Sequence, residues 1–183
     1  KDKIAIKKSR QVREKILNAL EILYSVGVPI DDLTARRLEK MAMCFLSLCK
    51  VNKASSWDKA ESHAQGHILR TRQIIEYINE NFEESISSGS YDDIRRKDLV
   101  RPVGMGLIVK SANNPDADTN DGTRGYAIED TFAELVKSYG TPQWNDKLSC
   151  FEIDQDYIDQ FQGKRELKKL EVSLDQGVTI TLD

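Results

Sequence analysis

The sequence contains no apolar run near the roughly 18 residues that a membrane-spanning helix requires. Its first ten residues, KDKIAIKKSR, are charged and lack the apolar core of a secretory signal peptide. These two absences argue against a membrane partner and predict a cytoplasmic location.

Cysteine is scarce, with three residues, an odd number, spread widely along the chain. This count does not favour the disulfide framework of a small secreted protein. Cys44 and Cys49 fall within an apolar helical pattern. They are expected to be buried thiols.

An excess of positive charge is also missing, because 27 Lys and Arg stand against 30 Asp and Glu and the net charge is −3. The total charge therefore gives no support to non-specific nucleic-acid binding. Such binding would have to rest on the few cations that touch phosphates. With 183 residues, 39% hydrophobic and 31% charged, the chain has the composition of an ordinary globular domain, with room for one added terminal piece.

Amphipathic helical patterns occupy the N-terminal third of the chain. Apolar residues recur at helical spacing from Ser9 to Ser25 and from Leu33 to Cys49, with a break at GVPIDD. Residues 50–66 lose this period and are typical of a long connection. Trp57, alone among polar residues there, is expected to pack onto the helical core.

A helix, a turn and a basic helix follow. The spacing predicts a helix from Arg70 to Phe82, with Thr71 as a cap, and a turn over Ser85–Gly89. The next helix is predicted to begin near Ser90 as its N-cap and to carry the triplet RRK. Pro102 is expected to kink or end it.

Two short apolar strands come next, Leu107–Lys110 and Tyr126–Ile128, joined by a polar loop over Asn113–Gly125. Helix, turn, basic helix and hairpin in this order are typical of a winged helix-turn-helix that binds duplex DNA. Beyond the hairpin, short helices are predicted over Thr131–Tyr139 and from Trp144 onward.

At about 100° per residue, Ile94, Leu99 and Pro102 fall on one apolar arc of the basic helix. Asp93, Arg96, Lys97 and Val100 lie on the opposite arc, and Arg95 lies near the edge of the apolar one. An outward Arg is suited to guanine, and Asp93 can accept from cytosine N4. The alternative is a solvated helix face with i,i+4 charge pairs. Residues in the turn can hold a phosphate, and those in the hairpin can reach phosphates or the minor groove. The predicted DNA-contact residues are Ser88, Ser90, Tyr91, Asp93, Arg95, Arg96, Lys97, Arg101, Lys110, Asn113, Asn114 and Arg124.

Three patterns resemble metal or catalytic sites but are incomplete. A calcium loop starting at Asp116 would need an acid at its twelfth position, which is Ala127. His63 and His67 are four residues apart, without an obvious third zinc ligand. Asp116 after proline, with the distant Glu166-Leu167-Lys168, mimics a magnesium nuclease, but no shared hairpin presents them together. We therefore predict no catalytic and no metal-binding residue in this chain.

The motifs VGVP, SSWDKA, IIEYINENF, GSYDDIRRKDL, GLIVKS, NPD, YAI and YGTPQW occur in this order from about Leu20 to Phe151. This order resembles the N-terminal domain of the BsuBI/PstI type of type II restriction endonuclease. The most specific parts are Ile94-Arg95-Arg96, Gly106-Leu107 and Tyr139-Gly140-Thr141 with Trp144.

The resemblance implies a prokaryotic helical domain of helix-turn-helix character that precedes a PD-(D/E)xK nuclease domain requiring magnesium. The final run LEVSLDQGVTITLD looks like the start of that second domain. The catalytic residues would then lie beyond Asp183, and a homodimer on a two-fold site is an assembly consistent with this type of enzyme. Pro102 and Gly104 depart from the family pattern and put the length of the basic helix in question.

Together, these observations predict a mainly α fold with a small β-hairpin: a winged helix-turn-helix with additional N-terminal helices. Residues 1–66 would form an N-terminal helical subdomain, 67–161 the DNA-binding region, and 162–183 a linker and the start of a nuclease domain. The expected function is sequence-specific binding of double-stranded DNA without catalysis or a cofactor in this piece. The alternatives are a transcription-regulator-like protein without a nuclease and a protein-interaction module.

Overall fold

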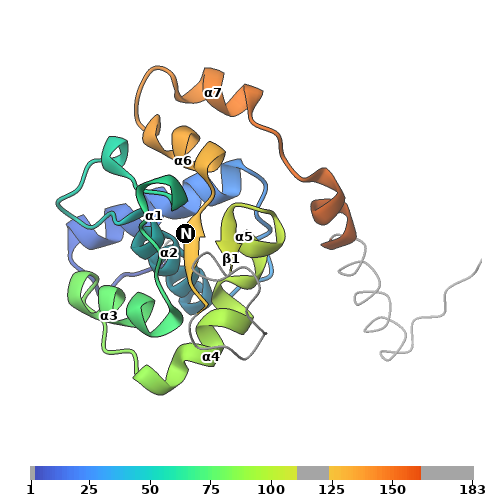
Figure 1. The fold of residues 1–183 in the computed structure, drawn as a ribbon. Coiled ribbons are helices and arrows are strands. Elements are labelled where there is room, and N and C mark those ends of the chain that lie inside the picture. Colours follow the sequence, from blue (N-terminus) through green and yellow to red (C-terminus); the bar gives the residue numbers. More distant parts are fainter. Residues whose placement is uncertain (1–2, 111–123, 162–183) are drawn as a thin grey trace, which may run out of the picture.

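The computed structural model describes residues 3–110 and 124–161. It is mainly helical and contains one two-stranded antiparallel sheet, which confirms the expected α-rich fold with a β-hairpin. In these two ranges no helix is both long and apolar enough to cross a membrane. Helices α3 and α4 lie at one end of the molecule and α6 and α7 at the other, with α1 and α2 between them (Figure 1).

The first two helices are α1 (Arg10–Ser25) and α2 (Ala35–Cys49). Every residue of α2 from position 41 to position 49 is buried, so this helix forms the centre of the core. It begins two residues later than the sequence suggested, because the Thr34 hydroxyl accepts a hydrogen bond from the Arg37 amide and caps the helix. The two helices pack on each other, as the apolar stripe of α1 requires.

The aromatic core joins α2 to the connection after it and to a later helix. The ring centroid of Phe45 lies 6.2 Å from that of Trp57 and 5.7 Å from that of Phe132. Trp57 is buried, as expected for a residue that packs onto the helical core. Cys44 and Cys49 are buried free thiols, as predicted, whereas Cys150 is an exposed free thiol.

After α3 (Thr71–Asn81) the chain does not form one regular basic helix, and this part of the prediction was wrong. Arg70, rather than Thr71, occupies the cap position of α3. The following helical stretch has four parts: a 3₁₀ turn (Ser88–Ser90), α4 (Tyr91–Asp93), a π-helical turn (Ile94–Asp98) and α5 (Val100–Gly104). We call Tyr91–Gly104 the basic segment. Pro102 sits in the first turn of α5, where a missing N–H is tolerated, and the segment ends at the glycine that follows.

The sheet consists of β1 (Ile108–Lys110) and β2 (Tyr126–Ile128), close to the predicted strands. Ile108 pairs with Ile128, and Lys110 pairs with Tyr126. On its other side Tyr126 also forms a bridge with Leu69, with backbone N···O distances of 2.9 and 2.8 Å. Leu69, two residues before α3, therefore adds a third strand position to the hairpin, and the chain from α3 to the basic segment forms the connection between Leu69 and β1.

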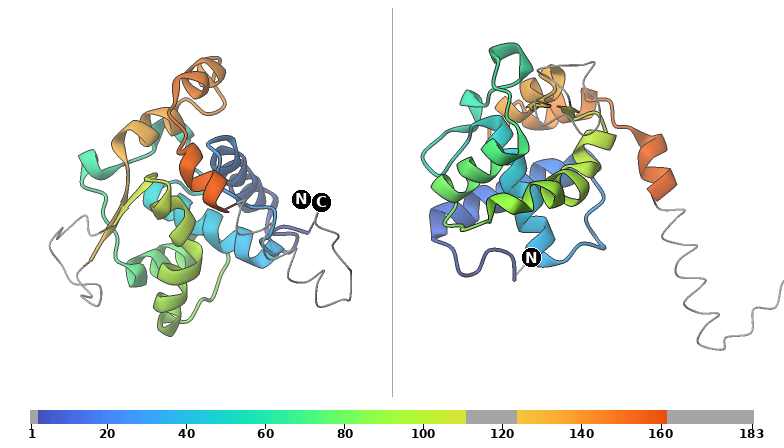
Figure 2. Two further views of the ribbon diagram at one scale, coloured as in Figure 1. Left: turned by 90° about the vertical axis from the view of Figure 1, so that its right-hand side faces the viewer. Right: turned by 60° about the horizontal axis from the view of Figure 1, so that its bottom comes forward.

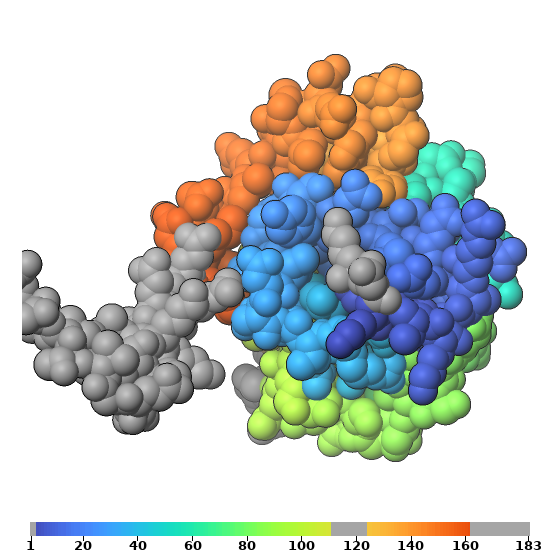
Figure 3. Space-filling model, turned by 180° about the vertical axis from the view of Figure 1, so that it is seen from behind, coloured from blue at the N-terminus to red at the C-terminus, as the bar shows by residue number. Residues whose placement is uncertain are grey.

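The remaining elements are α6 (Asp130–Lys137), α7 (Trp144–Cys150) and a helical stretch over residues 155–161. This last stretch passes close to two glycines of the body: an ideal Cβ on Gly104 would lie 2.6 Å from Tyr157 Cε2, and one on Gly27 would lie 2.6 Å from Ile158 Cδ1. The views from the side and from behind show this orange-red segment against the blue α1–α2 region (Figures 2 and 3). The two glycines let the segment dock.

Gly27→Ala is expected to lower the free energy of unfolding by about 2 kcal/mol, because its φ of +92° is strained for any other residue. The new methyl group would also push Ile158 and Ile153 away from the body. Urea unfolding measures the loss, and limited proteolysis measures release of residues 155–161.

Gly140→Ala is the matched control, since Gly140 has a φ of +77° but nothing within 4 Å of the position of its Cβ. Gly140→Ala should also lower the free energy of unfolding through backbone strain, but it should leave the proteolysis of residues 155–161 unchanged. If both variants release residues 155–161 equally, Gly27 does not hold this segment.

Candidate nucleic-acid interface

The π-helical turn determines which side chains of the basic segment face outward. The Leu99 amide donates to the Ile94 carbonyl at 2.9 Å, so these two apolar residues, five apart, both lie on the core side and are buried. On the other side, the side chains of Arg96 and Lys97 are 68% and 55% exposed. The wheel drawn from the sequence placed these four residues on the correct faces.

Two acids of α4 pair with the outward cations. Asp92 lies 2.7 Å from a guanidinium nitrogen of Arg95 and 3.0 Å from one of Arg96, and Asp93 lies 3.4 Å from Lys97 Nζ. The hydrogen bond from Arg95, with the charges of both arginines, lowers the pKa of Asp92. The charge pairs that the sequence offered as an alternative therefore exist in the free protein. They are exposed and weak, so a phosphate can replace them at little cost.

Asp98 anchors the basic segment to α2. Its carboxylate is fully buried and accepts a hydrogen bond from Arg37 Nη1 at 2.6 Å, while its second oxygen lies 3.6 Å from Lys40 Nζ. Burial raises the pKa of Asp98 despite these two cations. The sequence analysis missed this residue, although an acid between two buried positions, Ile94 and Leu99, was a visible signal.

The turn between α3 and the basic segment is fixed by side chains. The Asn79 side chain donates a hydrogen bond to the Ile86 carbonyl at 2.9 Å and accepts one from the Ile86 N–H at 2.8 Å. The Glu84 carboxylate accepts hydrogen bonds from both terminal nitrogens of the Arg36 guanidinium, at 2.6 and 2.9 Å, and it lies 2.7 Å from Lys8 Nζ. Burial opposes its ionisation, but the hydrogen bonds from Arg36 and Lys8 lower the pKa of Glu84. The N-terminal segment and α2 thus hold the turn in place.

The predicted phosphate-contact residues of the turn lie at the surface. Ser88 and Tyr91 are exposed, and Ser90 is half-buried. Ser90 occupies the cap position of α4 but makes no capping hydrogen bond with its side chain, contrary to expectation. The guanidinium of Arg72, from α3, lies 5.1 Å from the Tyr91 ring centroid and adds a cation beside the turn.

The electrostatic environment of Tyr126 in β2 includes charges from the hairpin and from the basic segment. The neighbour of Tyr126 across the sheet is Lys110, which is exposed. Burial raises the pKa of Tyr126, and the nearby charges of Arg124 and Arg95 oppose this shift. Arg124 and Arg95 therefore both act electrostatically on Tyr126, and Lys110 pairs with the same residue through the backbone of the sheet. Asn113 and Asn114 lie outside the described residues.

Arg101 differs from the other predicted DNA-contact residues. Its side chain is 13% exposed. The guanidinium donates to both carboxylate oxygens of Asp32 at 2.8 and 2.9 Å and to the Pro29 carbonyl at 2.7 Å, and it stacks on the Phe161 ring at 4.3 Å. Arg101 is therefore a structural residue that joins α5 to the connection between α1 and α2 and to residues 155–161. We therefore remove Arg101 from the DNA-contact set.

Within the described residues, no group of three or more His, Cys, Asp or Glu is arranged to hold a metal ion. His67 Nε2 lies 2.9 Å from the Ser47 carbonyl, and His63 is exposed. The loop with Asp116 and the stretch with Glu166 lie outside the described residues.

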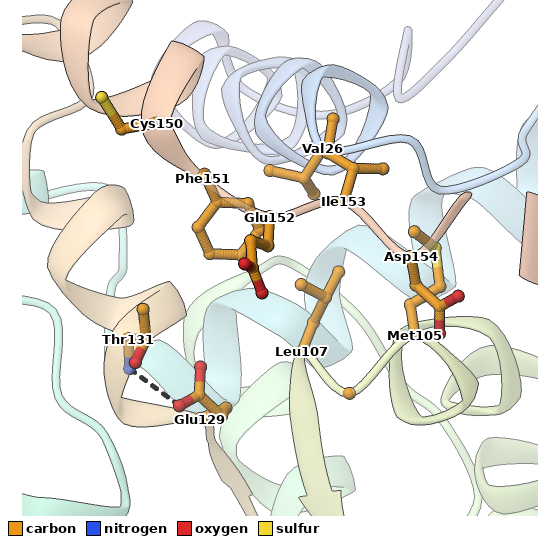
Figure 4. Close-up of a pocket in the computed structure, with 11 residues that line it drawn as sticks. Val26, Met105, Leu107, Glu129, Thr131, Cys150, Phe151, Glu152, Ile153 and Asp154 are labelled. Atoms are coloured by element: carbon orange, nitrogen blue, oxygen red, sulfur yellow. Dashed lines mark hydrogen bonds between the residues drawn. The ribbon is translucent and has the colours of Figure 1, made fainter. Parts of the chain in front are cut away.

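A hollow of about 430 Å³ lies between the α6–α7 region and the residues that directly follow α5 (Figure 4). Its lining mixes apolar side chains with carboxylates. One of these, Glu129, is already used: it accepts hydrogen bonds from the Thr131 and Phe132 amides at 2.9 and 2.8 Å and so caps α6. We assign no ligand to this hollow.

Comparison with known proteins gives three results. Residues 13–158 match a family model described as the BsuBI/PstI restriction endonuclease HTH domain. The type II restriction enzyme BsuBI of Bacillus subtilis is 24% identical over 170 residues, which are 92% of this chain and 51% of that enzyme. The solved structure of SdaI restriction endonuclease has a TM-score of 0.63 at 22% identity, over 79% of this chain and 41% of that one. The chain spans about half the length of the curated relative it matches.

Proposed function

Because the chain belongs to the family of BsuBI/PstI restriction endonuclease HTH domains, we propose that it binds duplex DNA sequence-specifically as the recognition part of a type II restriction endonuclease. In this proposal α3, the turn after it and the basic segment form the helix-turn-helix, and β1 and β2 form the wing. The piece described is non-catalytic, and cleavage belongs to a nuclease domain that uses magnesium.

One observation carries the proposal: the basic segment exposes two cations, Arg96 and Lys97, while its opposite face is buried against the core. A helix that enters the major groove needs base contacts from its outward face and phosphate contacts beside it. In this proposal Arg96 and Lys97 supply the base contacts, and Lys110 and Arg124 of the hairpin supply phosphate contacts. The bridge between Leu69 and Tyr126 supports the same topology, because it ties the start of the helix pair to the wing.

The proposed contacts fall into two classes. Asp93, Arg96 and Lys97 would meet base edges, where Arg suits guanine and Asp suits the cytosine amino group. The phosphate contacts would come from the turn, the edge of the basic segment and the wing, namely Ser88, Ser90, Tyr91, Arg95, Lys110 and Arg124. Two copies on a two-fold site would double this set.

Fluorescence anisotropy with a labelled duplex tests the proposal. We expect binding at low salt that weakens as salt rises, with a slope of about −0.9 for each phosphate neutralised. Site selection from a randomised duplex pool should then enrich one sequence. Absence of salt-dependent binding would reject a DNA partner and favour a protein-interaction role.

A further inference from the structure

Val100 is an exposed aliphatic side chain in the basic segment. It is 48% exposed, and it is not among the partly buried residues that pack against the hydrophobic core. The nearest apolar residues before and after it differ, since Leu99 and Pro102 are buried. A β-branched residue at the first position of α5 gains little from helix propensity and nothing from the core. The scaffold therefore gives no reason for a valine here.

Val100 is exposed in the same segment as the outward cations. It lies four residues after Arg96 and three after Lys97, at the start of α5 just beyond the π-helical turn, and all three residues are exposed. The outward face of the basic segment is therefore two cations followed by one branched apolar side chain. A surface that only bound phosphates would gain nothing from the apolar group.

The major groove offers one apolar feature, the methyl group at C5 of thymine, which 5-methylcytosine shares. We infer that Val100 is a specificity-determining residue that contacts a pyrimidine C5-methyl group. This inference rests on the proposed function. It adds to the proposed function one base position that is recognised by its methyl group. The charged residues do not specify that position.

The helix geometry also gives the approximate position of this base. Four residues correspond to about 6 Å along an α-helix axis, which is an upper limit here because the wider π-helical turn rises less per residue, and successive base pairs lie about 3.4 Å apart. The methyl group should therefore lie within about two base pairs of the base that Arg96 contacts.

The test uses the whole chain and the duplex that site selection enriches. Each thymine is replaced in turn by deoxyuridine, which lacks only the methyl group, and each cytosine by 5-methylcytosine. Anisotropy then gives the dissociation constants. We expect deoxyuridine at one position to weaken binding about fourfold, the change that corresponds to burial of one methyl group. If the recognised base is a methylated cytosine, its 5-methyl form should instead tighten binding by a similar factor.

Val100→Ala should abolish this difference between methylated and unmethylated duplexes while keeping the melting temperature. Ile6→Ala is the matched control, because Ile6 is an aliphatic side chain that is 61% exposed outside the basic segment. This control should retain the full fourfold effect.

The outcomes separate the inference from the proposed function. An enriched site without any methyl effect, or a methyl effect that persists in Val100→Ala, overturns the inference and leaves the proposed function standing. If no sequence is enriched, both are overturned.

Discussion

Asp98→Ala is expected to lower the free energy of unfolding by about 3 kcal/mol, and the melting temperature by on the order of 10 °C. The substitution removes a fully buried carboxylate that Arg37 contacts at 2.6 Å and leaves Lys40, whose side chain is 11% exposed, without its acidic neighbour. Because Asp98 ends the π-helical turn, the basic segment should also lose its fixed position on α2. Thermal and urea unfolding measure the stability, and DNA affinity reports the position of the segment.

Asp98→Asn is the matched control, because it removes the charge but keeps an oxygen that can accept from Arg37. We expect it to cost much less than Asp98→Ala. Similar losses for the two variants would show that the charge, rather than the hydrogen bond, holds the segment.

The stability of the protein should also carry a pH dependence from Asp98. Burial raises the pKa of this carboxyl above its usual value of 3.8, because the folded state binds the proton more tightly than the unfolded state does. Its contribution therefore favours folding at low pH and is lost as the pH rises from about 3.8 through the raised pKa. Asp98→Asn lacks this contribution, so the stability difference between the native protein and the variant should shrink as the pH rises. Parallel pH profiles would contradict the assignment.

Arg96→Ala is expected to reduce discrimination between the selected site and random duplex by about 1–3 kcal/mol, the range for loss of a bidentate contact to guanine. The side chain is 68% exposed and its partner Asp92 also binds Arg95, so the fold should not change. Affinities for the two duplexes, measured at one salt concentration, give the change directly.

Lys110→Ala provides the contrast for Arg96→Ala. Lys110 is exposed at the end of β1, where we propose a phosphate contact. Its loss should weaken binding to both duplexes alike and reduce the salt slope by about one. An equal loss of affinity on the selected and random duplexes for Arg96→Ala would reject its role in base recognition.

The local pattern of the sequence was sufficient for most of the helices and strands. Apolar spacing located α1, α2 and α3, and the two short apolar runs located β1 and β2, because a helix period and a strand run are local properties. The same spacing correctly divided Ile94 and Leu99 from Arg96 and Lys97. It did not reveal the π-helical turn, since a wheel drawn at 100° assumes one regular helix.

The roles of individual charged residues depended on contacts between distant parts of the chain. Arg101 is held by Asp32, 69 positions away, and Asp98 by Arg37, 61 positions away. No local pattern distinguishes such an arginine from one that faces solvent, so Arg101 was grouped with the DNA contacts.

By itself, the sequence determined the α-rich class, the order of helix, turn, basic segment and hairpin, and the family. Its motifs carry this information because they specify local structure and lineage. Only the tertiary structure decided that Arg101 belongs to the scaffold, how Asp98 fixes the basic segment on α2, and that Leu69 forms a bridge with Tyr126 of the hairpin. The physical reason is that burial and ion pairing depend on which distant residues become neighbours after folding.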